Sequence, residues 1–167
     1  MKMIKIADLS DLNAIVQLRV EQQIEDWIKT SNGKEYSIFA DEFEIITKNY
    51  ICKRLNKTIY FALMYIEETA VSMCALEIID NFPQITVCEN SSGKSAELVS
   101  VFTAPKYRGK GYMQILLDYF LDFAVKQGYT DIVLSTNTPD AKHIYEKFGF
   151  QYISDKYYLK AKEKIKC

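Results

Sequence analysis

The sequence predicts one mixed α/β domain over residues 1–167, and three observations support this fold class. The chain has 167 residues, of which 49% are hydrophobic and 26% charged, the balance of an ordinary soluble globular domain. No internal repeat and no Pro-rich or Gly/Ser-rich linker marks a boundary inside it. Strand-like and helix-like segments alternate through the second half, which indicates a sheet with at least one parallel pair joined by a right-handed crossover.

The first half is expected to hold a short strand, two helices and a β-hairpin. Apolar residues recur at helical spacing in two segments, separated by the helix-breaking run Ser31-Asn32-Gly33. Two later segments are rich in β-branched and aromatic residues, and Glu67-Glu68 between them favours a hairpin. The expected elements are a strand over residues 1–6, a helix from Asp8 or Ser10 to about residue 28, a helix from about residue 41 to 55, and strands over 57–66 and 69–79.

The second half is expected to alternate strands with helices after a loop. Turn-forming residues predict that loop over residues 81–95, with a short strand edge around 85–87. Pro105 ends the strand that follows, and Gly128 and Gly149 suit the left-handed position at which helices end. The expected elements are a strand over 97–103, a helix over 111–127, a strand start over 132–136, a helix over 139–148 and a strand over 150–159.

The charge balance excludes two classes of partner. Lys and Arg number 21 against 22 Asp and Glu, for a net charge of −1. Binding to nucleic acid or to an anionic membrane needs a large positive field, which this chain lacks. We therefore expect no nucleic-acid partner and no membrane partner.

Cysteine and histidine usage excludes several kinds of site. The four cysteines form no C-x-x-C pair, and His143 is the only histidine, so we expect no zinc or other metal site, no His-based triad and no redox dithiol.

The N-terminus has no apolar run of signal-peptide length, and the longest uncharged apolar stretch, residues 60–66, is too short to cross a bilayer. The expected location is the cytoplasm, with the thiols reduced.

A glycine-bearing loop between a strand and a helix is the most informative segment. Unpaired backbone N–H groups and the positive end of the helix dipole converge at such a helix start, which favours an anion. Gly109 and Gly111 let a phosphate approach the backbone, and Lys106, Arg108 and Lys110 add positive charge. The loop is neither a P-loop nor a dinucleotide fingerprint. The alternative is a tight turn with solvated lysines.

Two runs together resemble the Gcn5-related N-acetyltransferase (GNAT) superfamily. The run Pro105–Gly111 is similar to that family's R/Q-x-x-G-x-G/A pyrophosphate loop, with Arg108 and Gly111 matching. The run Ala141–Phe150 is similar to its A-x-x-x-Y-E-K-x-G-F segment. The resemblance is specific over Glu97–Phe150. It implies an acyl-CoA-binding fold whose central sheet is mostly antiparallel, with a splayed parallel pair, and is flanked by helices.

The resemblance also implies an activity and a cosubstrate. Members of this family are acyltransferases, so the chain is expected to transfer an acetyl group from acetyl-CoA to a primary amine by direct attack in a ternary complex. The N–H near Val101 would polarise the thioester carbonyl. Met113, where the family has a small residue, and Thr138, in place of a common Asn, depart from the pattern. The expected cofactor-binding residues are Val101, Phe102, Thr103, Arg108, Gly109, Lys110, Gly111, Tyr112, Met113, Gln114 and Asn137.

Two side chains are expected to move protons. An alkyl amine is mostly protonated at neutral pH, so the attack needs a base. Glu97 resembles the general base of the histone-acetylating branch of the family. The alternative is that Glu97 is a solvent-facing strand charge. Glu77 and Glu21 are the next candidates for the base. Tyr145 matches the family's general acid for the departing thiolate, the alternative being a packed aromatic side chain. His143 is expected on another face of the same helix, at the surface.

Several functional alternatives stay open at this stage. The chain could be a non-catalytic acyl-CoA-binding sensor, because Met113 would crowd the helix start. Within the same fold it could instead acylate a hydroxyl or a protein N-terminus. The acceptor is not identified by the sequence, and a monomer and a homodimer are both compatible with it.

Overall fold

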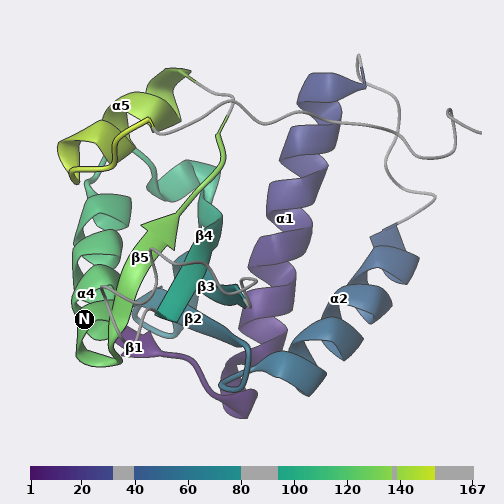
Figure 1. Ribbon diagram of the computed structural model, residues 1–167. Helices are drawn as coiled ribbons and strands as arrows, with labels where there is room; N and C mark the ends of the chain where they lie inside the picture. Colours follow the sequence, from purple (N-terminus) through teal and green to yellow (C-terminus); the bar gives the residue numbers. More distant parts are fainter. Residues whose placement is uncertain (32–39, 80–93, 137–138, 153–167) are drawn as a thin grey trace, which may run out of the picture. The chain divides into compact units, whose positions relative to one another are not determined.

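The computed structural model of the protein describes residues 1–31, 40–79, 94–136 and 139–152 (Figure 1). The chain forms two compact units, residues 1–134 and residues 135–167. Of the described elements, the first unit contains the whole β-sheet, three α-helices and two short 3-10 turns. No described helix has both the length and the apolar composition needed to span a bilayer.

A five-stranded mixed sheet forms the centre of the first unit, with its strands in sequence order. The first four strands pair antiparallel with their neighbours, and the last two pair parallel. This arrangement confirms the predicted mixed α/β class. The strands are β1 (Lys2–Ile6), β2 (Ile59–Ile66), β3 (Thr69–Ile79), β4 (Lys94–Thr103) and β5 (Tyr129–Val133).

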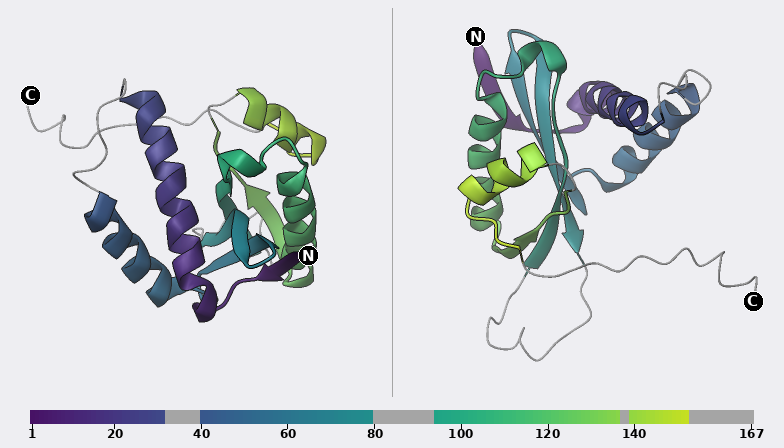
Figure 2. Two further views of the ribbon diagram at one scale, coloured as in Figure 1. Left: turned by 180° about the vertical axis from the view of Figure 1, so that it is seen from behind. Right: turned by 90° about the horizontal axis from the view of Figure 1, so that it is seen from above.

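Helices cover both faces of this sheet. Helix α4 lies on one face, and α1 lies on the other with α2 packed beside it (Figure 2). Asp8 caps the chain's first helical turn, since its side chain accepts a hydrogen bond from the Ser10 N–H at 2.7 Å. The helical elements of this unit are η1 (Leu9–Asp11), α1 (Leu12–Thr30), α2 (Ala40–Arg54), η2 (Pro105–Tyr107) and α4 (Tyr112–Lys126).

Each face of the sheet buries its own apolar layer. Under α1 and α2 the core joins Ile15 and Ile51 from the helices to alternate sheet residues such as Leu63 and Met73. Successive side chains of a strand point to opposite faces, so the intervening residues of β2 and β3 face α4. Helix α4 buries Leu116, Leu117, Phe120 and Ala124 there. Burial on both faces explains why β2 is apolar throughout and why β3 is apolar over most of its length.

Three strands differ from the sequence prediction by two residues or more, the first being β2, which begins at Ile59 rather than at residue 57. Strand β4 begins at Lys94, so Ser95, expected in a loop, is already paired. Strand β5 spans Tyr129–Val133 rather than residues 132–136. Its parallel pairing with β4 starts at Tyr129, which is 8% exposed and follows directly on Gly128. The next two residues, Thr130 and Asp131, are polar and exposed, as is common on the edge strand of a sheet. A search for an uninterrupted apolar run therefore misses the beginning of β5.

The second unit contains helix α5 (Pro139–Lys147), which ends in a glycine-based cap. Gly149 has a φ of 87°, the Phe150 N–H donates to the Tyr145 carbonyl at 3.2 Å, and the Gly149 N–H donates to the Glu146 carbonyl at 3.0 Å. This is the Schellman pattern, and the accompanying apolar contact is the edge-on packing of Tyr145 against Phe150. The described residues 150–152 form no strand, and the remainder of the predicted strand over 150–159 lies outside the described residues, as does the predicted strand edge at 85–87.

We predict that the buried carboxylate of Asp11 stabilises the first unit. Asp11 is 5% exposed and accepts hydrogen bonds from the Tyr65 hydroxyl at 2.8 Å and the Asp8 N–H at 2.9 Å, with the Lys5 ammonium 2.8 Å away. Burial opposes ionisation, but these contacts outweigh it and lower the pKa of Asp11. Asp11→Asn should lower the free energy of unfolding by about 1–3 kcal/mol at pH 7, measured by urea denaturation.

The acid dependence of that contribution has a definite sign. Because the folded-state pKa of Asp11 is lowered from 3.8, its contribution is complete above that pH and disappears as the pH falls through the folded-state value. The gap between wild type and Asp11→Asn should therefore narrow in acid. Tyr65→Phe, which removes one hydrogen bond and keeps the charge, should cost less at pH 7. A gap independent of pH would show that the carboxylate charge is not the stabilising feature.

Candidate active site

Strand β4 contains one residue more than its partner at the centre of the sheet. Val99 pairs with Ala75 and Phe102 pairs with Met73, so Ser100 and Val101 together lie opposite Cys74. Ser100 has a φ of 52°, which a non-glycine residue rarely adopts. The extra residue shifts the alternation of side chains, so that Val99 and Phe102 both face the core under α1. This is a β-bulge, and such bulges bend a strand and re-aim its backbone groups.

The parallel pair of strands is joined over only part of β4. Strand β5 pairs with residues 94–97 of β4 and ends at Val133. Among the described residues, no strand pairs with β4 on that side beyond Glu97. The pair is therefore splayed, as the resemblance implied, and the edge of β4 that follows Glu97 can accept an extended ligand by added-strand pairing.

The predicted edge residues Val101, Phe102 and Thr103 lie at this bulge and beyond it. The side chain of Phe102 is buried in the α1 core, so only its backbone can meet a ligand. Each of the three carbonyl oxygens already accepts a side-chain hydrogen bond: Val101 from Gln22 at 3.3 Å, Phe102 from Ser72 at 3.0 Å and Thr103 from Arg108 at 2.8 Å. A carbonyl oxygen has a second lone pair, so these bonds orient the strand edge without exhausting it.

The start of α4 has the geometry of an anion site. Gly111 is its N-cap in the left-handed conformation, with no side-chain capping bond, and Gly109 shares the same φ of 72°. The Ile115 N–H is bonded to the Gly111 carbonyl at 3.2 Å, which leaves the preceding N–H groups without an intrahelical acceptor. Those groups belong to three predicted cofactor-binding residues, Tyr112, Met113 and Gln114.

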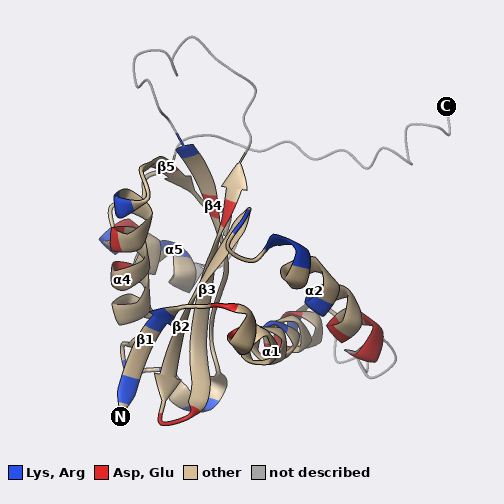
Figure 3. Ribbon diagram, turned by 90° about the horizontal axis from the view of Figure 1, so that it is seen from below, with Lys and Arg blue, Asp and Glu red and all other residues tan. Residues whose placement is uncertain are grey.

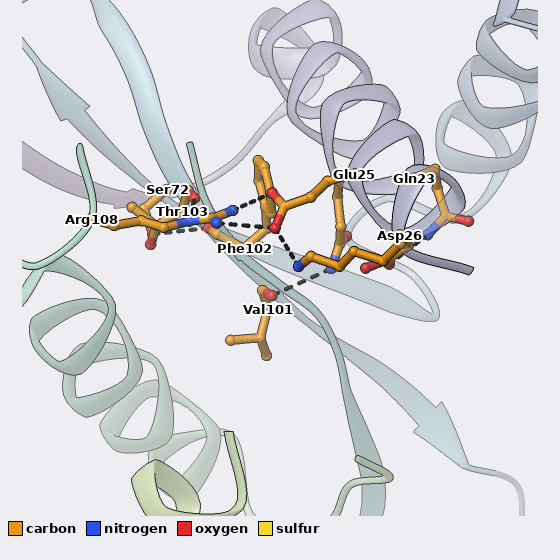
Figure 4. A network of polar contacts seen from close by, with 10 residues as sticks. Gln23, Glu25, Asp26, Ser72, Val101, Phe102, Thr103 and Arg108 are labelled. Atoms are coloured by element: carbon orange, nitrogen blue, oxygen red, sulfur yellow. Dashed lines mark hydrogen bonds and ion pairs between the residues drawn. The ribbon is translucent and has the colours of Figure 1, made fainter. Parts of the chain in front are cut away.

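The cations around this loop are arranged unequally. The Lys106 and Lys110 ammonium groups both lie against the Tyr107 ring, 5.2 and 5.6 Å from its centroid, and both side chains are exposed. The Arg108 guanidinium instead points to α1, where it forms an ion pair with Glu25 (Figure 4). Hydrogen bonds from Arg108 lower the pKa of Glu25 to about 2. Lysine charge is therefore exposed at the loop, whereas the charge of Arg108 is already paired.

Two of the candidate bases lie side by side. Glu97 and Glu77 are directly opposed on β4 and β3, so their side chains share the face of the sheet that α1 and α2 cover. The Tyr50 hydroxyl of α2 donates to Glu77, and this bond raises the pKa of Tyr50. Arg54 lies over the Tyr50 ring, 4.0 Å from its centroid. Glu21, the other reserve, is exposed on α1.

The remaining predicted residues lie beyond the first unit or outside the described chain. Tyr145 lies on α5 of the second unit, half-buried against Phe150, and His143 is exposed on the same helix. Asn137 and Thr138 are outside the described residues. Across the residues that are described, no group of three or more His, Cys, Asp or Glu side chains could hold a metal ion.

Sequence reasoning missed the side chains that connect the helices to this site. Gln22 and Glu25 reach β4 and the following loop from α1, and Tyr50 reaches Glu77 from α2. Their partners are 79, 83 and 27 residues away in the sequence. The only local signal is the helical periodicity that places residues 22 and 25 on one face of α1.

Known proteins share this fold and this sequence pattern. Residues 19–150 match the Acetyltransferase (GNAT) family. A Rattus norvegicus protein named N-acetyltransferase 8B is 30% identical over 112 residues, which cover 62% of this chain and 50% of that protein. The chain thus spans about half the length of this curated relative.

Solved structures agree with this match at the level of the fold. A predicted acetyltransferase of Clostridium acetobutylicum, crystallised with acetyl-CoA, has a TM-score of 0.74 at 22% identity, covering 98% of each chain. A GCN5-related N-acetyltransferase of Ralstonia eutropha has a TM-score of 0.75 at 15% identity, covering 96% of this chain and 99% of its own. Because the family match covers residues 19–150, the chain belongs to the acetyltransferase (GNAT) family.

Proposed function

We propose that this protein transfers an acetyl group from acetyl-CoA to a primary amine, by direct attack within a ternary complex. The observation that carries the proposal is the adjacency, within one strand-loop-helix segment, of the open, bulged edge of β4 and the uncapped start of α4. The crystallisation of a structural neighbour with acetyl-CoA supports the cosubstrate, and the name of the rat relative supports an amine acceptor.

The two parts of the segment suit the two ends of the cosubstrate. The N–H groups that precede Ile115, together with Gly109 and Lys110, suit the pyrophosphate because they combine free donors with positive charge. The edge over Val101, Phe102 and Thr103 suits the amide-bearing pantetheine arm, which pairs as an added strand. The N–H at Val101 would then stabilise negative charge on the thioester oxygen.

The proposed reaction exchanges one bond for another and needs two proton transfers. The amine nitrogen bonds to the thioester carbonyl carbon, the carbon–sulfur bond breaks, and CoA leaves as a thiolate. Glu97 takes the proton from the amine, directly or through one water, and Tyr145 supplies a proton to the thiolate. We place this reaction in the cytoplasm, where the exposed free thiol of Cys52 would stay reduced.

Acidic side chains favour a cationic acceptor. Glu21 is exposed on α1, and Asp41 and Glu42 form the first turn of α2, whereas Lys53 and Arg54 lie in its last turn (Figure 3). The carboxylates of Glu77 and Glu97 would themselves attract a positively charged amine, because they are opposed on neighbouring strands. Asp41 and Glu42 lie at the other end of α2 from the Tyr50–Glu77 contact and do not add to this attraction.

A panel of cationic, neutral and anionic amines, with CoA release as the readout and mass spectrometry of the product, tests this function. Turnover with an amine supports the proposal. Tight acetyl-CoA binding without turnover on any acceptor would support the alternative of an acyl-CoA sensor. That alternative is favoured by Met113, which is half-buried at the start of α4 where the family has a small residue. Acylation of hydroxyl acceptors alone would redirect the proposal to O-acylation.

We predict that Gly111→Asp abolishes acetyl-CoA binding. The substitution places a carboxylate at the N-cap, against the pyrophosphate, and forces a side chain into a backbone with a φ of 72°. Isothermal titration calorimetry should detect no binding. Gly128→Asp is the matched control, because Gly128 has a φ of 81° beyond the other end of α4. Equal affinity losses in the two variants would show that strain, rather than anion binding, is the cause.

We predict that Glu97→Gln lowers kcat/KM by about 10²–10⁴-fold at neutral pH and flattens the acidic limb of its pH profile. Glutamine keeps the size of the side chain and its place opposite Glu77, but it cannot accept the proton. Glu77→Gln, on the neighbouring strand, is the control and should have a smaller effect. An unaltered profile for Glu97→Gln would move the base to Glu77, to Glu21 or to water.

We predict that Tyr145→Phe lowers kcat by about 10²-fold while leaving acetyl-CoA affinity nearly unchanged. The variant keeps the ring that packs against Phe150 and removes only the hydroxyl, so α5 should keep its cap. Stopped-flow or steady-state assays measure the change, with the exposed Tyr152→Phe as the control. A loss of less than about tenfold, or about 1.4 kcal/mol of barrier, would mean that Tyr145 only packs.

A further inference from the structure

An ion pair joins the loop before α4 to helix α1. The Arg108 Nη1 donates to Glu25 Oε1 at 3.0 Å, and its Nη2 donates to Oε2 of the same carboxylate (Figure 4). The third donor, Nε, bonds the Thr103 carbonyl at 2.8 Å. The guanidinium carbon also lies 5.4 Å from the centroid of the Phe102 ring. Only arginine can make this planar, two-pronged contact while also donating a third bond.

A second contact from the same helix reaches the β-bulge. Gln22 lies three residues before Glu25 and therefore on the same face of α1. Its amide oxygen accepts from Arg19 at 2.8 Å, which directs its nitrogen to the Val101 carbonyl at 3.3 Å. Helix α1 thus contacts β4 at the bulge and, through Arg108, at the end of the strand.

The charge of Arg108 is compensated where it lies. Arg108 lowers the pKa of Glu25 to about 2, with Lys29 contributing, so the pair stays ionised at any pH near neutrality. All three cationic side chains of the loop are exposed, but the Glu25 carboxylate compensates the charge of Arg108, whereas Lys106 and Lys110 lie against the uncharged Tyr107 ring. Arg108 occupies the basic position of the pyrophosphate-loop motif, but its side chain is ion-paired with helix α1.

We propose that Arg108 and Glu25 are positioning residues that hold the bulged end of β4 and the glycine loop against α1, and that Arg108 does not bind the cosubstrate phosphate. The pyrophosphate is held by backbone N–H groups at the start of α4 and by lysine charge. The proposal rests on the proposed function in taking this loop as the acetyl-CoA site.

A double-mutant cycle tests this role. Glu25→Gln, Arg108→Gln and the double variant are compared for their CoA dissociation constant by calorimetry and for thermal unfolding without ligand. Each single change should weaken CoA binding by about five- to tenfold. The double variant should bind CoA no more weakly than the single variant with the larger loss of affinity. The effect should appear in the KM for acetyl-CoA, with kcat at saturation changed less than about twofold.

Three further variants separate positioning from direct charge. Lys29→Gln removes the other cation that contacts Glu25 and should leave CoA affinity unchanged. Lys110→Gln should weaken binding, and its effect should add to that of Arg108→Gln. Arg108→Lys should behave like Arg108→Gln, because a lysine cannot make the fork, although it would serve well as a phosphate ligand.

Two results would overturn the proposal. One is CoA affinity that is unchanged or improved in Glu25→Gln, and the other is affinity that is retained in Arg108→Lys. Failure of the wild type to bind CoA would instead overturn the proposed function. In that case thermal unfolding still tests the ion pair. If the stability loss of the double variant equals the sum of the two single losses, Arg108 and Glu25 do not interact in a way that stabilises the fold.

Discussion

The site depends on one extra residue in β4. Because Ser100 and Val101 face the single residue Cys74, the strand changes the direction of its side chains without leaving the sheet. The residues before the bulge and the residues after it can then both supply apolar side chains to the α1 core, while the pairing with β5 stops at Glu97.

The same segment then changes from strand to helix within a few residues. Thr103 ends β4, the turn η2 follows, and two glycines with positive φ lead into α4. Helix α4 is anchored by Leu116, Leu117 and Phe120, which are at most 1% exposed. The free N–H groups at its start are therefore held by packing in the first two to three turns of the same helix, and a ligand would find them already oriented.

The sequence predicted the local features well because local chemistry determines them. Apolar periodicity located α1, α2 and α4, and the glycines at 109, 111, 128 and 149 marked backbone positions that do have positive φ. The boundary errors at Ser95 and Tyr129 arose where pairing with a distant strand overrode the local pattern. The bulge had no sequence signal at all, because Ser100 is neither glycine nor asparagine, and only the register against β3 reveals the extra residue.

Arg108 shows why matching a motif does not assign a role. Its position in the loop predicts a basic side chain beside the anion site, and the backbone conformation of that loop agrees. Where the guanidinium points is decided by Glu25, 83 residues earlier, on a helix outside the segment of specific resemblance. A carboxylate offers two acceptors in one plane that match two N–H groups of the guanidinium, so the pair fixes the direction of the arginine side chain as well as compensating its charge. A substitution at Glu25 on α1 can therefore change the role of Arg108 without altering the sequence of the loop itself.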